Sequence, residues 1–122
     1  MEPDLEELYS SLGGDASIVD RFVRDYLNLL DERLPDIRRY LRTGNDEAAY
    51  VALLSLETTT AMFGVPDVVR AIHALRQAVG QQSADDLLQS LTQVAAGVHA
   101  LRHQLVVGLI ERAAEHPPFA AD

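Results

Sequence analysis

Histidine is the residue type in this sequence that is best suited to chemistry at neutral pH. His99 and His103 lie four residues apart, a spacing that can direct two imidazoles at one metal ion. The glutamate of the H-E-x-x-H zinc motif is missing between them, so we expect no metal site there. His73 stands alone beside an apolar stripe, and we expect it to lie at the edge of the core without a chemical role.

The composition excludes several other chemistries. The chain has no cysteine, and all of its basic residues are arginines. Thiol nucleophiles, thiolate metal ligands and Schiff-base formation are therefore excluded. The net charge is −9 and no run of arginines is long enough to follow a phosphate backbone, so we expect no nucleic-acid binding. No stretch approaches ~18 consecutive apolar residues, so we expect a cytoplasmic protein without a membrane partner.

The apolar residues recur at spacings of three and four, which predicts helices and no strands. Capping residues, glycines and prolines divide the chain into a short first helix and four longer ones, over 4–12, 17–43, 46–63, 66–79 and 84–116. The core-facing stripe of the second segment begins at Ile18, and Pro35 lies inside the segment. Because proline lacks the amide hydrogen that a helix interior needs, we expect a kink or a break there.

The short connections between these helices determine the predicted fold. Successive amphipathic helices joined by a few residues must run antiparallel and bury their apolar stripes together. We therefore predict an all-α fold, an up-and-down antiparallel four-helix bundle with a short extra N-terminal helix laid across it. Residues 1–116 form a single domain in this interpretation, and 117–122 form a flexible C-terminal tail.

The predicted helix over 46–63 has an unusual outer side. Its core-facing residues are Ala49, Ala52, Leu53, Leu56, Thr60 and Phe63. The opposite side presents Glu47, Tyr50, Leu54, Glu57, Thr58 and Ala61, with Val51 and Met62 at one margin. A leucine therefore lies at the centre of a surface where a polar residue is the ordinary choice.

Two polar features accompany the apolar stripes. Arg102 falls inside the stripe of the last helix, where we expect it to extend its guanidinium to solvent or to pair with a carboxylate from another helix. Thr59 and Thr60 reduce helix propensity, but their hydroxyls can bond to backbone carbonyls of the preceding turn while they pack toward the core.

From about Leu5 to about Leu105 the chain resembles histidine phosphotransfer (HPt) domains of two-component phosphorelays. The segment "LYSSLGGDASIVDRFVRDYL" is similar to the opening of that family, and "RTGNDEAAYVALL" to the turn into its active helix. The segment "AMFGVPDVVRAIHAL" is similar to the glycine and the helix that follow its active site. The resemblance implies the same four-helix fold.

The active helix of that family carries the motif H-x-x-K-G, followed six residues later by a second glycine. When Gly64 is matched to the second glycine, Leu54 takes the place of the phosphoacceptor histidine. Glu57 then replaces the lysine, and Thr58 replaces the first glycine. Leucine cannot form a phosphoryl intermediate, and a glutamate repels the phosphoryl oxygens that a lysine would stabilise.

The resemblance thus implies a catalytically inactive, HPt-like module that acts by binding, without enzymatic activity, metal or cofactor. Its partner would be the receiver domain of a response regulator or a histidine kinase, and it would act as an inhibitor or an adaptor of the phosphorelay. The partner-binding surface, which we call the Leu54 face, comprises Tyr50, Leu54, Glu57, Thr58 and Ala61.

Two other functions remain open. The Leu54 face, or the apolar "LVVGLI" end of the last helix, could join two copies of the chain in a homodimer. Alternatively, phosphotransfer could have moved to His73, His99 or His103, although none of these has the lysine and glycine of the family motif.

Overall fold

The computed structural model describes residues 6, 8, 10 and 13–115. The ordered elements are α2 (Ala16–Thr43), α3 (Asp46–Thr60), the 3₁₀ turn η1 (Ala61–Phe63), α4 (Pro66–Ala78) and α5 (Ala84–Glu115). The described part of the chain is therefore all-helical, as the sequence predicts. The predicted first helix falls mainly on residues outside the described set, and so does the predicted tail, 117–122.

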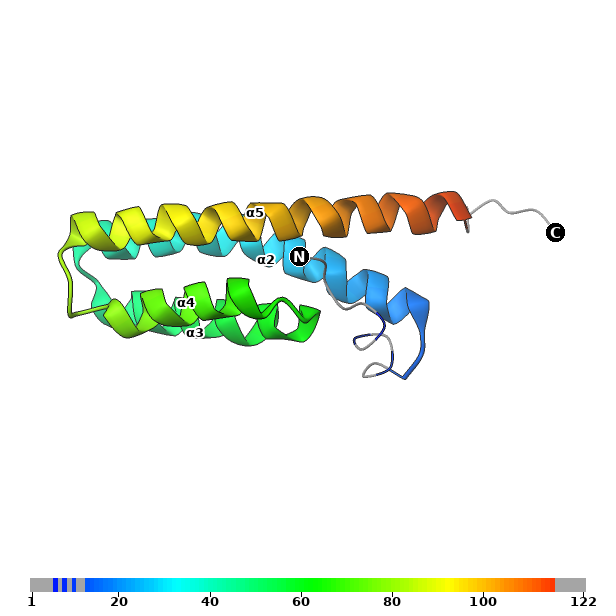
Figure 1. Cartoon of the computed structure of the whole chain (residues 1–122), viewed down its shortest axis with the longest axis horizontal. Coiled ribbons are helices and arrows are strands. Elements are labelled where there is room, and N and C mark those ends of the chain that lie inside the picture. Colours follow the sequence, from blue (N-terminus) through cyan, green and yellow to red (C-terminus); the bar gives the residue numbers. More distant parts are fainter. Residues whose placement is uncertain (1–5, 7, 9, 11–12, 116–122) are drawn as a thin grey trace.

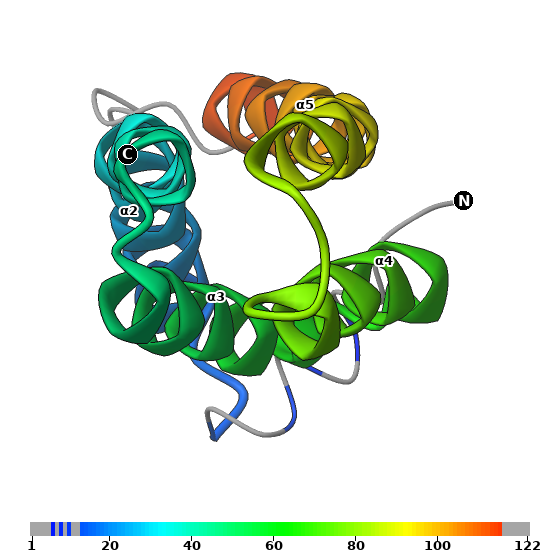
Figure 2. The same ribbon diagram turned by 90° about the vertical axis from the view of Figure 1, so that its left-hand side faces the viewer.

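The four helices lie around one shared core. Helix α2 packs against α3 and α5, and α4 packs against the same two helices. The view along the helices shows the pairs α2 and α5 on one side and α3 and α4 on the other (Figure 2). Because α2 and α5 are the longer helices, they extend past α3 and α4 at one end (Figure 1).

The helix ends follow local rules that can be read from the sequence. The side chains of Asp15 and Asn45 accept hydrogen bonds from amides in the first turns of α2 and α3. The Ser83 hydroxyl does the same for the Asp86 amide at the start of α5, as predicted. Gly44 and Gly64 adopt left-handed conformations after α2 and η1, which a side chain would disfavour.

Two features of α2 differ from the sequence predictions. Of the kink or break expected at Pro35, the break is wrong, because α2 continues through the proline. Helix α2 packs against both α3 and α5, and tertiary packing of this kind can maintain a helix that lacks one amide hydrogen. Ile18 was expected in the core but is 43% exposed, while Val19 is buried instead. The stripe is displaced by one residue at the start of α2, where α3 and α4 no longer cover it.

A buried hydrogen bond fixes the end of α3 against α2. The hydroxyl oxygens of Tyr26 and Thr60 lie 2.7 Å apart, and both residues are buried. Burial raises the pKa of Tyr26 to about 12, so the phenol stays protonated. Thr60 therefore bonds across the core rather than to a carbonyl of its own helix, whereas Thr59 donates to the Ser55 carbonyl as expected.

The described helices also bear on the membrane prediction. None of them combines the length and the apolar character that a membrane-crossing helix requires.

Candidate functional site: the Leu54 face

Helix α3 has the two sides that its sequence predicts. All six residues expected in the core are buried, namely Ala49, Ala52, Leu53, Leu56, Thr60 and Phe63. On the other side Leu54 is 42% exposed and Tyr50 is 41% exposed, and Thr58 and Ala61 are also exposed. Val51 and Met62 are exposed at the margin. The Leu54 face is thus a continuous surface of α3 and η1 with a leucine at its centre.

Glu57 is the member of the Leu54 face that is least exposed, because Arg76 of α4 covers it. The Arg76 Nε donates to Glu57 Oε1 at 2.7 Å, and Arg76 Nη2 lies 3.5 Å from Glu57 Oε2. The side chains of Glu57 and Arg76 retain 18% and 9% of their exposure. This two-armed ion pair joins α3 to α4.

Tyr50 is held by the same arginine. The Arg76 Nη1 donates to the Tyr50 hydroxyl at 2.7 Å, and the guanidinium carbon lies 5.1 Å from the centre of the Tyr50 ring. The contact therefore combines a hydrogen bond with a cation–π interaction. Tyr50 and Glu57 lie on either side of Leu54 along α3, so Arg76 fixes both flanks of the leucine.

His73 of α4 lies next to this network. Its Nδ1 is 3.2 Å from Glu57 Oε2 and 2.9 Å from Arg76 Nη2. A neutral imidazole cannot use one nitrogen both to donate to Glu57 and to accept from Arg76, so the tautomer decides which contact is a hydrogen bond. The side chain is half exposed. His73 therefore lies at the edge of the core, as predicted, but it contacts two charged groups of the site.

At Glu57 the sequence predicts a negative charge that repels phosphoryl oxygens. In the structure a positive charge, that of Arg76, lies directly beside it. The hydrogen bond from Arg76 lowers the pKa of Glu57, with a further contribution from His73. The hydrogen bond to Glu57 in turn raises the pKa of Arg76. Glu57 is thus ionised and neutralised within the chain, and the expected repulsion of a phosphoryl group is reduced by the adjacent guanidinium.

Thr58 and Ala61 form the far end of the face. The Thr58 hydroxyl donates to the Leu54 carbonyl at 2.9 Å, so this polar group is satisfied within α3. Ala61 begins η1, where the helix tightens before Gly64 reverses the chain. Thr58 thus presents a β-branched side chain at the surface of α3.

His99 and His103 lie outside the Leu54 face. His99 and His103 are both exposed on α5. In the described ranges, no group of three or more histidine, cysteine, aspartate or glutamate residues is placed to hold a metal ion. Arg102, between them, donates to Asp31 of α2 at 2.5 Å, which confirms the predicted pairing with a carboxylate of another helix.

Sequence reasoning missed Arg76, although a signal was present. Arg76 follows Val68 and Ile72 at intervals of four, so it falls on the buried stripe of α4. A charged residue at such a position requires a buried partner. Glu57 is that partner. It lies 19 residues before Arg76 on another helix, so the pattern within α4 does not identify it.

Comparisons of the chain with protein-family models, with curated proteins and with solved structures found no match.

Proposed function

We propose that this chain is an HPt-like, up-and-down four-helix bundle that binds a protein partner through the Leu54 face and does not transfer phosphoryl groups. The observation that carries the proposal is the 42% exposure of Leu54 at the centre of a surface whose flanks are fixed by Arg76. An apolar centre with ordered polar edges is the usual composition of a protein-binding surface. The resemblance to HPt domains supplies the class of partner, a receiver domain or a histidine kinase.

The contacts of the Leu54 face favour binding over catalysis. Leu54 has no nucleophilic atom, and the nearest carboxylate, Glu57, is occupied by Arg76. Tyr50 and Arg76 belong to the residue types that contribute most to protein interfaces. Since their side chains are already ordered, a partner that docks on Leu54 loses little conformational entropy in fixing them.

A specific contact favours one second candidate, phosphotransfer through His73. When Nδ1 donates to Glu57, the proton lies on that nitrogen and Nε2 carries the nucleophilic lone pair. When Nδ1 instead accepts from Arg76, Nε2 is protonated and cannot attack phosphorus. Phosphotransfer through His73 therefore requires the tautomer in which Nδ1 donates to Glu57 and does not accept from Arg76.

The test measures binding to the receiver domains of the host, phosphorylated and unphosphorylated, together with the mass of the protein in solution. Leu54→Arg should abolish binding because it places a charge at the apolar centre. The matched control is Ile18→Arg, which puts the same charge on a 43% exposed apolar residue of α2 outside both candidate surfaces and should bind normally. Dimerisation of the wild type that Leu54→Arg abolishes, without binding to any receiver, would replace the proposal by the homodimer.

The same mixtures decide the second candidate. Incubation with a phosphorylated receiver should leave no acid-labile phosphate on this chain, while an active HPt domain acquires it. Phosphate that appears on the wild type and disappears in His73→Gln would assign the transfer to His73. Phosphate that persists in His73→Gln would point to another histidine.

A further inference from the structure

A pocket with a cavity volume of about 440 Å³ opens between α2 and α5. Its floor is formed by Leu30, Leu34, Leu91 and Ala95, and three arginines of α2 line it, Arg38, Arg39 and Arg42; we call it the arginine pocket. The volume lies within the range of about 300–1,000 Å³ typical of small-molecule sites. The pocket involves none of the residues of the Leu54 face.

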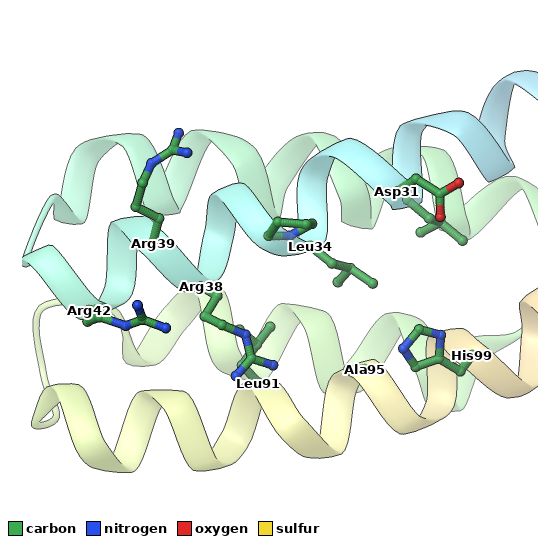
Figure 3. A pocket seen from close by; sticks show the side chains of 10 residues that line it. Asp31, Leu34, Arg38, Arg39, Arg42, Leu91, Ala95 and His99 are labelled. Atoms are coloured by element: carbon green, nitrogen blue, oxygen red, sulfur yellow. The ribbon is translucent and has the colours of Figure 1, made fainter.

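Arg38 and Arg42 extend from α2 toward α5 across the mouth of the pocket (Figure 3). They are four residues apart and therefore lie on the same side of the helix. Within the ranges that the structure describes, neither guanidinium has a hydrogen-bond or ion-pair partner. Two adjacent cations next to an apolar floor are thus available to a ligand.

The other charged groups around the pocket are already paired. Asp31 binds Arg102 at 2.5 Å, so its carboxylate does not neutralise the two available arginines. Arg39 pairs with Asp36 at 3.1 Å and stacks over the Tyr40 ring. Arg39 also lines the pocket, although Figure 3 shows its guanidinium directed away from α5.

The distribution of charge supports an anionic occupant. The chain has a net charge of −9, yet four of its ten basic residues lie within 33–42. A local concentration of arginine in an acidic protein creates one region of positive potential, which attracts anions selectively. A guanidinium matches the geometry of carboxylate and phosphate groups through paired hydrogen bonds.

From these observations we propose that the arginine pocket binds a small amphiphilic anion. Its acidic head group, a carboxylate or a phosphate monoester, lies between Arg38 and Arg42. Its hydrocarbon part lies on the floor formed by Leu34, Leu91 and Ala95 and extends toward His99 of α5, which lines the other end. Removal of the hydrocarbon from water contributes binding free energy in addition to that of the charge-assisted hydrogen bonds. The proposal is independent of any partner of the Leu54 face.

The experiment titrates the full chain with four probes by calorimetry and follows backbone amide shifts. Octanoate and octyl phosphate carry both parts of the proposed ligand, octanol lacks the charge and acetate lacks the hydrocarbon. At least one of the first two should bind saturably, about tenfold or more tightly than octanol and acetate. The shifts should be largest around Leu34, Leu91 and Ala95. The tighter of the two head groups distinguishes a carboxylate ligand from a phosphate monoester.

Variants separate the pocket from general electrostatics. Arg38→Gln and Arg42→Gln should each weaken binding of the tighter probe by about tenfold, because each removes a charge-assisted contact. The control is Arg24→Gln, which makes the same change in charge at an exposed position of the same helix that does not line the pocket, and should bind normally. Ala95→Phe fills the floor and should abolish binding, while its thermal melting verifies that the protein is folded.

Three results would overturn the proposal. One is the absence of saturable binding of octanoate and octyl phosphate at millimolar concentrations. Another is an equal loss of affinity in Arg24→Gln and Arg42→Gln, which would assign binding to the overall charge of α2. The third is a loss of stability without a loss of binding in Arg42→Gln, which would assign this arginine to the C-terminal end of its helix.

Discussion

Arginines lie at both the Leu54 face and the arginine pocket, but they differ in burial and in the partners that they contact. On the Leu54 face, Arg76 is almost fully buried and makes contacts with Glu57, Tyr50 and His73. At the arginine pocket, Arg38 and Arg42 are exposed, and the described part of the chain provides no partner for them. An arginine with internal partners contributes to structure, whereas one without them can contribute to binding. Residue type alone does not separate the two roles.

The largest predicted effect tests whether Leu54 is contact surface rather than core. Leu53 and Leu54 are neighbours in α3, but Leu53 is fully buried and Leu54 is 42% exposed. Leu53→Ala should lower the free energy of unfolding by about 2–5 kcal/mol, because it leaves a cavity. Leu54→Ala should lower it by no more than about 1 kcal/mol. Urea denaturation measures both, and equal losses would mean that Leu54 packs in the core.

The next prediction compares the two kinds of arginine directly. Arg76→Gln should lower Tm by several degrees, because the carboxylate of Glu57 is then partly buried without its main partner. Arg42→Gln should change Tm by less than about 2 degrees, since its guanidinium has no partner to lose. The double variant Arg76→Gln with Glu57→Gln should regain part of the loss. A Tm of Arg76→Gln equal to that of Arg42→Gln would contradict the structural role of Arg76.

The smallest predicted effect is a dependence on pH at the Leu54 face. The pKa of Glu57 is lowered in the folded protein, chiefly by the hydrogen bond from Arg76. The unfolded state therefore binds the proton at higher pH than the folded state does. The stabilisation is complete above the ordinary glutamate pKa of about 4.5 and is lost as the pH falls through the lowered pKa.

Urea midpoints measured at several pH values check this dependence. The wild type should lose stability below about pH 4.5 more steeply than Glu57→Gln, which has no carboxyl group to protonate. Identical slopes for the two proteins would show that Arg76 does not lower the pKa of Glu57.

The helices and the two sides of α3 were predictable from the sequence because both depend on local rules. The caps at Asn45 and Ser83 and the left-handed conformation of Gly64 depend only on residues a few positions away in the sequence. The position of Leu54 across the helix from buried Leu56 follows from the helical repeat alone. The exposure of Leu54 could therefore be predicted without any knowledge of the partners of α3.

The features that the sequence did not reveal depend on contacts between distant segments. The pairing of Glu57 with Arg76 spans 19 residues, and it changes the Leu54 face from an unpaired anion to a neutralised ion pair. The arginine pocket needs both α2 and α5, so no single stretch contains it. The continuity of α2 through Pro35 also depends on the neighbouring helices, since a local rule favours interruption.

Pro35 has a consequence for the local stability of the pocket wall. Because it has no amide hydrogen, the carbonyl of Asp31 lacks its usual partner four residues later, and both residues line the arginine pocket. We therefore expect this turn of α2 to open more readily than the interior turns on either side of it. Amide hydrogens there should exchange with solvent faster than those near Val23 or Leu41, and a ligand that spans α2 and α5 should slow this exchange.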